Sequence, residues 1–207
     1  MTHFVFDCDD VLLNWQSGFI TYLTERGITP CPKGPQSWNL APWLGCSQEA
    51  ARSWVMRFNT SPSFSRLTPM RGAVETLWAL HDAGHSISIL TACGLEPSLR
   101  QARIQNLRDV FARGETCPWE NVQMLALGES KFTHLYDIYE QVAGRTDICF
   151  VEDNFDNARS GVANGMTSYC LRRSHNRHHE DAHPDTFVKW IDTINEIACL
   201  HVQQTVE

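Results

Sequence analysis

The stretch Phe4-Val5-Phe6-Asp7-Cys8-Asp9-Asp10-Val11 joins a short apolar run to three acids. Uninterrupted apolar runs of this length are typical of strands that are buried on both faces of a parallel sheet. A second run, Ile148-Cys149-Phe150-Val151, also ends in acids, Glu152 and Asp153. A third run, Ser86-Ile87-Ser88-Ile89-Leu90, ends at the hydroxyl of Thr91. We therefore expect buried strands that end in polar side chains.

The sequence around these runs alternates between strand and helix patterns from residue 73 onward. Strands are predicted over 86–90, 123–127, 148–151 and 167–171, and helices over 73–83, 100–112, 131–142 and 156–163. A last amphipathic helix is expected over 187–200. This alternation indicates an α/β fold, a Rossmann-like, doubly wound parallel sheet with helices on both faces.

Residues 13–69 interrupt this alternation. Helices are predicted over 15–26 and 47–58, with Ser47 as an N-cap residue, and a loop containing several prolines is predicted over 29–46. We therefore expect two parts: an α/β core made of residues 1–12 and 70–207, and a small helical cap, residues 13–69, inserted after the first strand.

The composition is that of an ordinary globular protein, with 43% hydrophobic and 20% charged residues among 207 and a formal net charge of −7. The absence of a long basic run argues against stable binding to duplex nucleic acid. The sequence shows neither an apolar stretch of membrane-spanning length nor a signal-peptide pattern, so we expect a cytoplasmic protein. Eight cysteines, none in a Cys-x-x-Cys pair, predict buried thiols instead of a zinc site.

The strand ends predict where ligands bind, because the carboxyl ends of parallel strands meet at one edge of the sheet. Two strands bring five carboxylates to that edge: Asp7, Asp9, Asp10, Glu152 and Asp153. Carboxylates that lie so close together repel one another unless a cation lies among them. Oxygen ligands without histidine or cysteine favour Mg²⁺ over zinc. The alternative, that these acids only cap helices, explains one acidic strand end better than two.

Four segments, in order, resemble the four motifs of the haloacid dehalogenase superfamily. The first is the Asp-x-Asp that follows the strand at Phe4, and the second is the strand that ends at Thr91. Lys131 is similar to the lysine of the third motif, and the Glu152-Asp153 pair resembles the acids of the fourth. The family often has glycine where this chain has Asp10, and Asp-Asp or Gly-Asp where it has Glu152-Asp153.

The resemblance implies a phosphoryl-transfer site with a covalent intermediate. Asp7 is expected to attack phosphorus, and Asp9 to act as the acid and base. Thr91 and Lys131 are expected to bind the phosphoryl oxygens, with help from the backbone N–H groups of Ala92 and Cys93.

The resemblance also implies a Mg²⁺ site made by Asp7, by the backbone carbonyl of Asp9 and by the acids of the fourth motif. Of these acids we expect Asp153 to bind the metal and Glu152 to act as an outer ligand. Asp156 is a further candidate, although an acid at a helix start explains it equally well.

The substrate is expected to be a small phosphate ester. Family members that cleave carbon–halogen or phosphonate bonds lack the second aspartate, so Asp9 favours phosphoester hydrolysis. The cap is rich in aromatic residues, and Trp15 and Phe64, near its junctions with the core, are expected to face the substrate. Residues 58–73 resemble the return from cap to core in 5′(3′)-deoxyribonucleotidases, which implies a nucleoside monophosphate.

Three alternatives remain open at this point. The first is a phosphatase that acts on polynucleotide ends, and the second is a phosphatase of another small metabolite. The third is an inactive binding module that kept the fold. The histidines at 175, 178, 179 and 183 suggest a transition-metal site, but their spacing forms no regular ligand pattern and favours a solvated polar loop.

Overall fold

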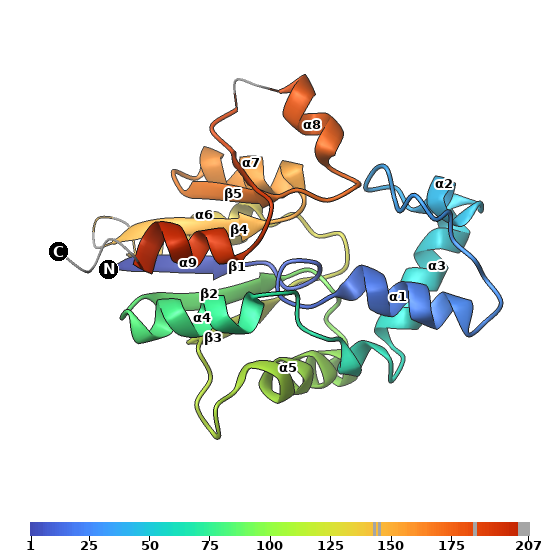
Figure 1. Ribbon diagram of the computed structural model, residues 1–207, viewed down its shortest axis with the longest axis horizontal. Coiled ribbons are helices and arrows are strands. Elements are labelled where there is room, and N and C mark those ends of the chain that lie inside the picture. The colour runs from blue at the N-terminus through green and yellow to red at the C-terminus, as the bar shows by residue number, and fades with distance from the viewer. Residues whose placement is uncertain (143, 145, 184–185, 203–207) are drawn as a thin grey trace.

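The computed structural model describes residues 1–142, 144, 146–183 and 186–202. Its centre is a sheet of six parallel strands in the order β3-β2-β1-β4-β5-β6 (Figure 1). The strands are β1 (Thr2–Phe6), β2 (Ser86–Thr91), β3 (Asn121–Met124), β4 (Asp147–Glu152), β5 (Thr167–Leu171) and β6 (Lys189–Ile191). The structure confirms the predicted doubly wound α/β fold. The strand order reverses between β1 and β4, and a crevice for ligands forms at such a point.

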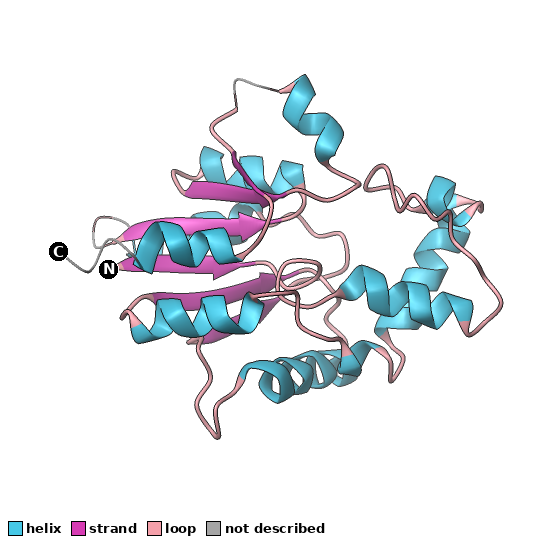
Figure 2. Ribbon diagram, viewed as in Figure 1, coloured by secondary structure: helices cyan, strands magenta, loops and turns pink. Residues whose placement is uncertain are grey.

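Helices cover both faces of this sheet, as Figure 2 shows. On one face lie α4 (Ala73–Asp82), α5 (Pro97–Phe111) and α9 (Asn195–Val202), which pack with Phe4 and Phe6 of β1. On the other lie α6 (Phe132–Val142), which packs with Val5 and Phe150, and α7 (Phe155–Ala163), which packs with Cys170. Alternate residues of β1 thus enter different cores, which explains its unbroken apolar sequence. Within the described residues, no helix is both long enough and apolar enough to cross a membrane.

The insert between β1 and α4 lies beyond the carboxyl ends of the strands (Figure 1). It contains α1 (Trp15–Thr24), α2 (Ala41–Leu44), α3 (Gln48–Asn59) and the short 3₁₀ helix η1 (Phe64–Arg66). The Oγ atom of Ser47 accepts a hydrogen bond from the Ala50 N–H (3.2 Å), as expected of an N-cap. The two connections to the core run side by side, because Asn14 N–H donates to Thr68 O (2.9 Å) and Met70 N–H to Leu12 O (2.8 Å).

The prediction of one helix over 187–200 is wrong. Residues Lys189–Ile191 form β6, which pairs with β5, and α9 begins only at Asn195. The parallel pairing of Tyr169, Cys170 and Leu171 with Lys189, Trp190 and Ile191 prevails over the helical pattern at the edge of the sheet. Between the two elements, Glu196 Oε1 accepts hydrogen bonds from the N–H groups of Asp192 and Thr193 (both 2.8 Å).

Gly161 sets how closely α7 approaches the sheet. A Cβ atom at this position would lie 2.3 Å from Ser168 Oγ and 2.8 Å from Cδ1 of Phe150, both on buried strands. In an exposed helix, alanine is more favourable than glycine by about 1 kcal/mol. Here the steric conflict outweighs that gain, because an inserted methyl in a packed core costs about 1–3 kcal/mol.

We therefore predict that Gly161→Ala lowers the free energy of unfolding in urea by about 1–2 kcal/mol. Arg159→Ala, at an exposed position of the same helix, serves as the control and changes it by less than about 0.5 kcal/mol. A Gly161→Ala protein as stable as the wild type would show that α7 shifts away from the sheet at little cost.

Candidate active site

The turn that follows β1 presents its acids in a fixed order. Asp7 N–H donates to Val151 O (2.9 Å), and Cys8 O accepts hydrogen bonds from the N–H groups of Leu12 (2.9 Å) and Leu13 (2.8 Å). Asp10 has a φ of 58°, the left-handed region that glycine usually fills and that aspartate tolerates. Its Oδ1 accepts a hydrogen bond from the Gln16 N–H (2.9 Å), which fixes the start of α1. Asp10 thus preserves the turn. Burial and the nearby carboxylate of Asp153 raise the pKa of Asp10 to about 7.

Three buried carboxylates meet at the ends of β1 and β4. Asp7, Glu152 and Asp153 each offer an oxygen that lies within 4.8 Å of the other two. Lys131 lies just before α6, is 1% exposed, and donates to Asp7 Oδ1 and to Glu152 Oε2 (2.8 Å). Burial and the nearby Glu152 raise the pKa of Asp7 well above its ordinary value, although Lys131 opposes this. Lys131 is thus paired with two of the three acids, and the concentration of carboxylates favours a further cation.

Glu152 and Asp153 differ in their surroundings. Glu152 uses both oxygens: Oε2 accepts from Lys131, and Oε1 accepts from Asn157 Nδ2 (2.9 Å) and from the Asn154 N–H (3.3 Å). The backbone carbonyl of Asp153 accepts a hydrogen bond from Asn176 Nδ2 (2.7 Å) and lies 3.1 Å from His175 Nε2, and the same nitrogen lies 3.3 Å from the carboxylate oxygen Oδ2 of Asp153. Burial raises the pKa of Glu152, whereas Lys131 lowers it. The carboxylate of Glu152 is thus engaged by the protein itself.

Thr91 supplies a buried hydroxyl at the same edge of the sheet. It is 1% exposed, and among the described residues its Oγ1 has no hydrogen-bond partner. A buried hydroxyl that remains unpaired costs about 1–3 kcal/mol, so this group is suited to a ligand. The following residues, Ala92 and Cys93, begin a loop in which Cys93 O accepts a hydrogen bond from Asn59 Nδ2 (3.3 Å) of α3.

Arg103 is a site residue that the sequence analysis missed. It lies on α5 and is completely buried, and its Nη2 is 2.5 Å from Asp9 Oδ1. Its guanidinium carbon lies 3.9 Å from the ring centroid of Phe64. Burial raises the pKa of Asp9 and the arginine opposes the shift. The signal was its position between Leu99 and Leu107, a four-residue spacing that places Arg103 on the apolar face of α5.

His175 and Asn176 are also missed site residues, because the histidine-rich stretch was predicted as a solvated polar loop. Both are buried beside Asp153, and residues Arg177–Ala182 form the short helix α8. The hydrogen bonds of Asp153 raise the pKa of His175 although burial alone would lower it. Arg173, two residues earlier, donates from Nε (3.1 Å) and Nη2 (2.7 Å) to Asp10 O. This stretch therefore braces both acidic strand ends.

The two aromatic residues expected to face the substrate lie in different surroundings. Trp15 is half-buried, and its ring centroid lies 4.8 Å from that of Phe19, with the two rings tilted by 33°. Its Nε1 donates to Asn59 Oδ1 (3.0 Å), and the Nδ2 of the same asparagine donates to Cys93 O. Phe64 has no exposed surface, because it packs with Phe58 and Arg103. Its ring therefore offers no face to a ligand, and a stacking role for Phe64 does not fit this structure.

The sequence matches no family model and no curated protein. Solved structures do match over nearly the whole chain. A haloacid dehalogenase-like hydrolase from Streptococcus pneumoniae has a TM-score of 0.67 and 12% identity, over 97% of this chain and 98% of the other. A hydrolase of that family from Deinococcus radiodurans, with bound phosphate and sodium, has a TM-score of 0.60 and 18% identity, over 96% of this chain and 94% of the other. The L-2-haloacid dehalogenase of Xanthobacter autotrophicus has a TM-score of 0.56 and 19% identity, over 99% of each chain.

These likenesses define the class of fold: the chain has the fold of the haloacid dehalogenase-like hydrolases. The structures that share it include both a phosphate-bound hydrolase and a dehalogenase, so the fold alone does not select the reaction. The choice between them depends on the side chains of this site.

Arg103 provides a test of how the site is held together. We predict that Arg103→Met lowers the free energy of unfolding by about 3 kcal/mol, because it leaves Asp9 in a desolvated site without its partner. Urea unfolding measures this change. Arg100→Met, at an exposed position of the same helix, is the matched control and is expected to change stability by less than about 0.5 kcal/mol. Equal stability of the two variants would mean that Arg103 contributes no net stabilisation.

Proposed function

We propose that this chain is a magnesium-dependent phosphomonoester hydrolase in which Asp7 becomes transiently phosphorylated, with a nucleoside monophosphate as substrate. The observation that carries the proposal is the buried cluster of Asp7, Glu152 and Asp153 around Lys131, with the unpaired hydroxyl of Thr91 at the same sheet edge. Asp9, two residues after Asp7, favours phosphoester hydrolysis over dehalogenation. A cytoplasmic location is part of the same proposal.

The donor set fits Mg²⁺, because the three clustered side chains offer only carboxylate oxygens and carry more negative charge than Lys131 balances. Asp7, Asp153 and the backbone carbonyl of Asp9 would hold the ion. Glu152, engaged by Lys131 and Asn157, would act as an outer ligand that positions the lysine. The bound ion supplies charge neutralisation at the phosphoryl oxygens.

In the first half of the reaction, the Asp7 carboxylate attacks phosphorus and the bond from phosphorus to the ester oxygen breaks. Asp9 gives its proton to the leaving alkoxide. In the second half, Asp9 takes a proton from water, the resulting hydroxide attacks phosphorus, and the bond to Asp7 breaks with release of phosphate. Arg103 binds Oδ1 of Asp9, which leaves Oδ2 for proton transfer.

Lys131 and Thr91 would bind the phosphoryl oxygens as charge develops on them. Lys131, desolvated and hydrogen-bonded to Asp7, brings a fixed positive charge beside the nucleophile. Thr91 donates its hydroxyl, and the backbone N–H groups of Ala92 and Cys93 follow it in the chain.

We further propose that residues 13–69 act as a cap that selects the leaving group. Supporting this, the insert lies beyond the strand ends that carry the acids (Figure 1). The half-buried Trp15, linked through Asn59 to Cys93 O, is the candidate for stacking on a base.

The nucleophile is tested by Asp7→Asn, which keeps the shape of the side chain and removes its nucleophilic charge. We predict a loss of at least about 1,000-fold in kcat for a nucleoside monophosphate. Release of inorganic phosphate from purified, folded protein measures it. Asp137→Asn, the same change at an exposed position of α6, retains full activity as a control. Near-normal turnover of Asp7→Asn would rule out Asp7 as the nucleophile.

The metal is tested by chelation and titration. EDTA is predicted to abolish phosphate release, and Mg²⁺ to restore it. Asp153→Asn should raise the half-saturating Mg²⁺ concentration by about 100-fold, and Glu152→Gln by about 10-fold, because loss of an outer ligand weakens metal affinity less severely. Full activity after exhaustive chelation would refute metal dependence, and the reverse order of the two variants would exchange the roles of these acids.

A further inference from the structure

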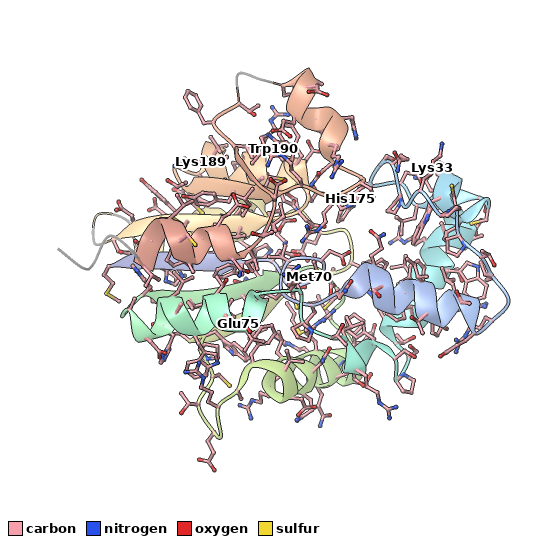
Figure 3. All side chains as sticks on the ribbon, in the orientation of Figure 1. Lys33, Met70, Glu75, His175, Lys189 and Trp190 are labelled. Atoms are coloured by element: carbon pink, nitrogen blue, oxygen red, sulfur yellow. The ribbon has the colours of Figure 1, made fainter. Side chains whose placement is uncertain are left out.

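A cleft of about 620 Å³ lies between the insert and the stretch that leads into α8. Lys33 and Gln36 of the insert line one side, and Ser174, Arg177 and His178 line the other. Figure 3 shows Lys33 on the insert loop opposite the segment that carries His175. The volume is within the range of about 300–1,000 Å³ that is usual for small-molecule sites.

The cleft is lined by positive charge, although the protein as a whole is negatively charged. The chain has a formal net charge of −7, whereas the residues lining the cleft include Lys33, Arg177 and His178 and, among the described residues, no carboxylate. Lys33 and Arg177 approach from opposite walls, so an anion between them would meet two permanent positive charges. Gln36 and Ser174 add neutral hydrogen-bonding groups. This combination suits a phosphate or a carboxylate.

The wall of the cleft is attached to the acidic site. Arg173 donates two hydrogen bonds to Asp10 O, and His175 Nε2 lies 3.3 Å from Asp153 Oδ2, so Ser174 is held between two anchored neighbours. The opposite wall approaches closely, because a Cβ on Gly34 would lie 3.0 Å from Ser174 Oγ. The ring of Trp38 also lies 5.3 Å from that of His175. Residues 173–175 therefore contact both the acidic strand ends and the wall of the cleft.

We propose that this cleft binds a second anionic group of the substrate, so that a phosphomonoester with an additional phosphate or carboxylate is hydrolysed in preference to the corresponding ester without it. This inference rests on the proposed function, which places the scissile phosphate at Asp7. Lys33 and Arg177 select the substrate and take no part in the chemical steps.

Matched substrate pairs test the proposal. Thymidine 3′,5′-bisphosphate is compared with thymidine 5′-monophosphate for a second phosphate, and 3-phosphoglycerate with glycerol 3-phosphate for a carboxylate. In at least one pair, the member with the extra anionic group should have a kcat/KM higher by roughly 10- to 100-fold, the usual effect of charge-assisted hydrogen bonds. The pair that shows the preference identifies the anion. The preference should shrink as salt is raised from 50 to 500 mM, because exposed charges are screened.

The double variant Lys33→Gln/Arg177→Gln should abolish the preference and leave hydrolysis of p-nitrophenyl phosphate unchanged. The control Arg52→Gln/Arg108→Gln removes the same charge from exposed positions on α3 and α5 and should keep the preference. Equal kcat/KM values within both pairs, or a preference that persists in Lys33→Gln/Arg177→Gln, would overturn the proposal.

A failure of the proposed function would give a different experimental result. If the wild-type protein with Mg²⁺ releases phosphate from none of these compounds or from p-nitrophenyl phosphate, the hydrolase assignment is wrong. Calorimetric titration with the same pairs then tests the cleft. Tighter binding of the more anionic member that is lost in Lys33→Gln/Arg177→Gln supports the anion site, and equal binding or no binding refutes it.

Discussion

The ion pairs of Lys131 with Asp7 and Glu152 are the interaction on which the site depends. They connect three elements: the end of β1, the end of β4 and the start of α6. A buried pair of this kind is costly to desolvate and adds little net stability, so its main effect is to fix the positions of the side chains in the site. Removing Lys131 would leave the buried Asp7 and Glu152 without the cation that they share. The placement of Asp7 relative to Glu152 therefore depends on one ammonium group that contacts both carboxylates.

The sheet order explains why these groups meet. β1 and β4 are neighbours although about 140 residues separate them, and Phe6 pairs with Val151 in register. The next residues, Asp7 and Glu152, therefore emerge at the same edge. A shift of one residue in either strand would turn its acids toward the opposite face. The large buried side chains on both faces of β1 hold that register, so the apolar core sets the precision of the polar cluster.

The sequence alone predicted the parts of the site that depend on local pattern. Apolar runs identified β1, β2 and β4, and the residues directly after them identified Asp7, Thr91 and Glu152. Arg103 was missed, because nothing local shows that an arginine on α5 faces an aspartate almost a hundred residues earlier. His175 was missed because a run of histidines suggested solvent exposure, whereas His175 is buried and its Nε2 lies beside the carboxylate of Asp153. β6 was missed because its pairing with β5 is also nonlocal.

The paired connections of the insert have a consequence for how such a protein can change. Residues 12–14 and 68–70 leave and rejoin the core side by side, through backbone hydrogen bonds that require no particular side chain. The chain thus enters and leaves the insert at one place, and the other contacts between insert and core, such as Asn59 with Cys93 O and Phe64 with Arg103, are made by side chains. A segment joined in this way can lengthen, shorten or be exchanged without disturbing the strand register of the sheet. The inserted segment can therefore diverge while the sheet and the acids at its edge stay as they are, and one scaffold can carry a series of different inserts.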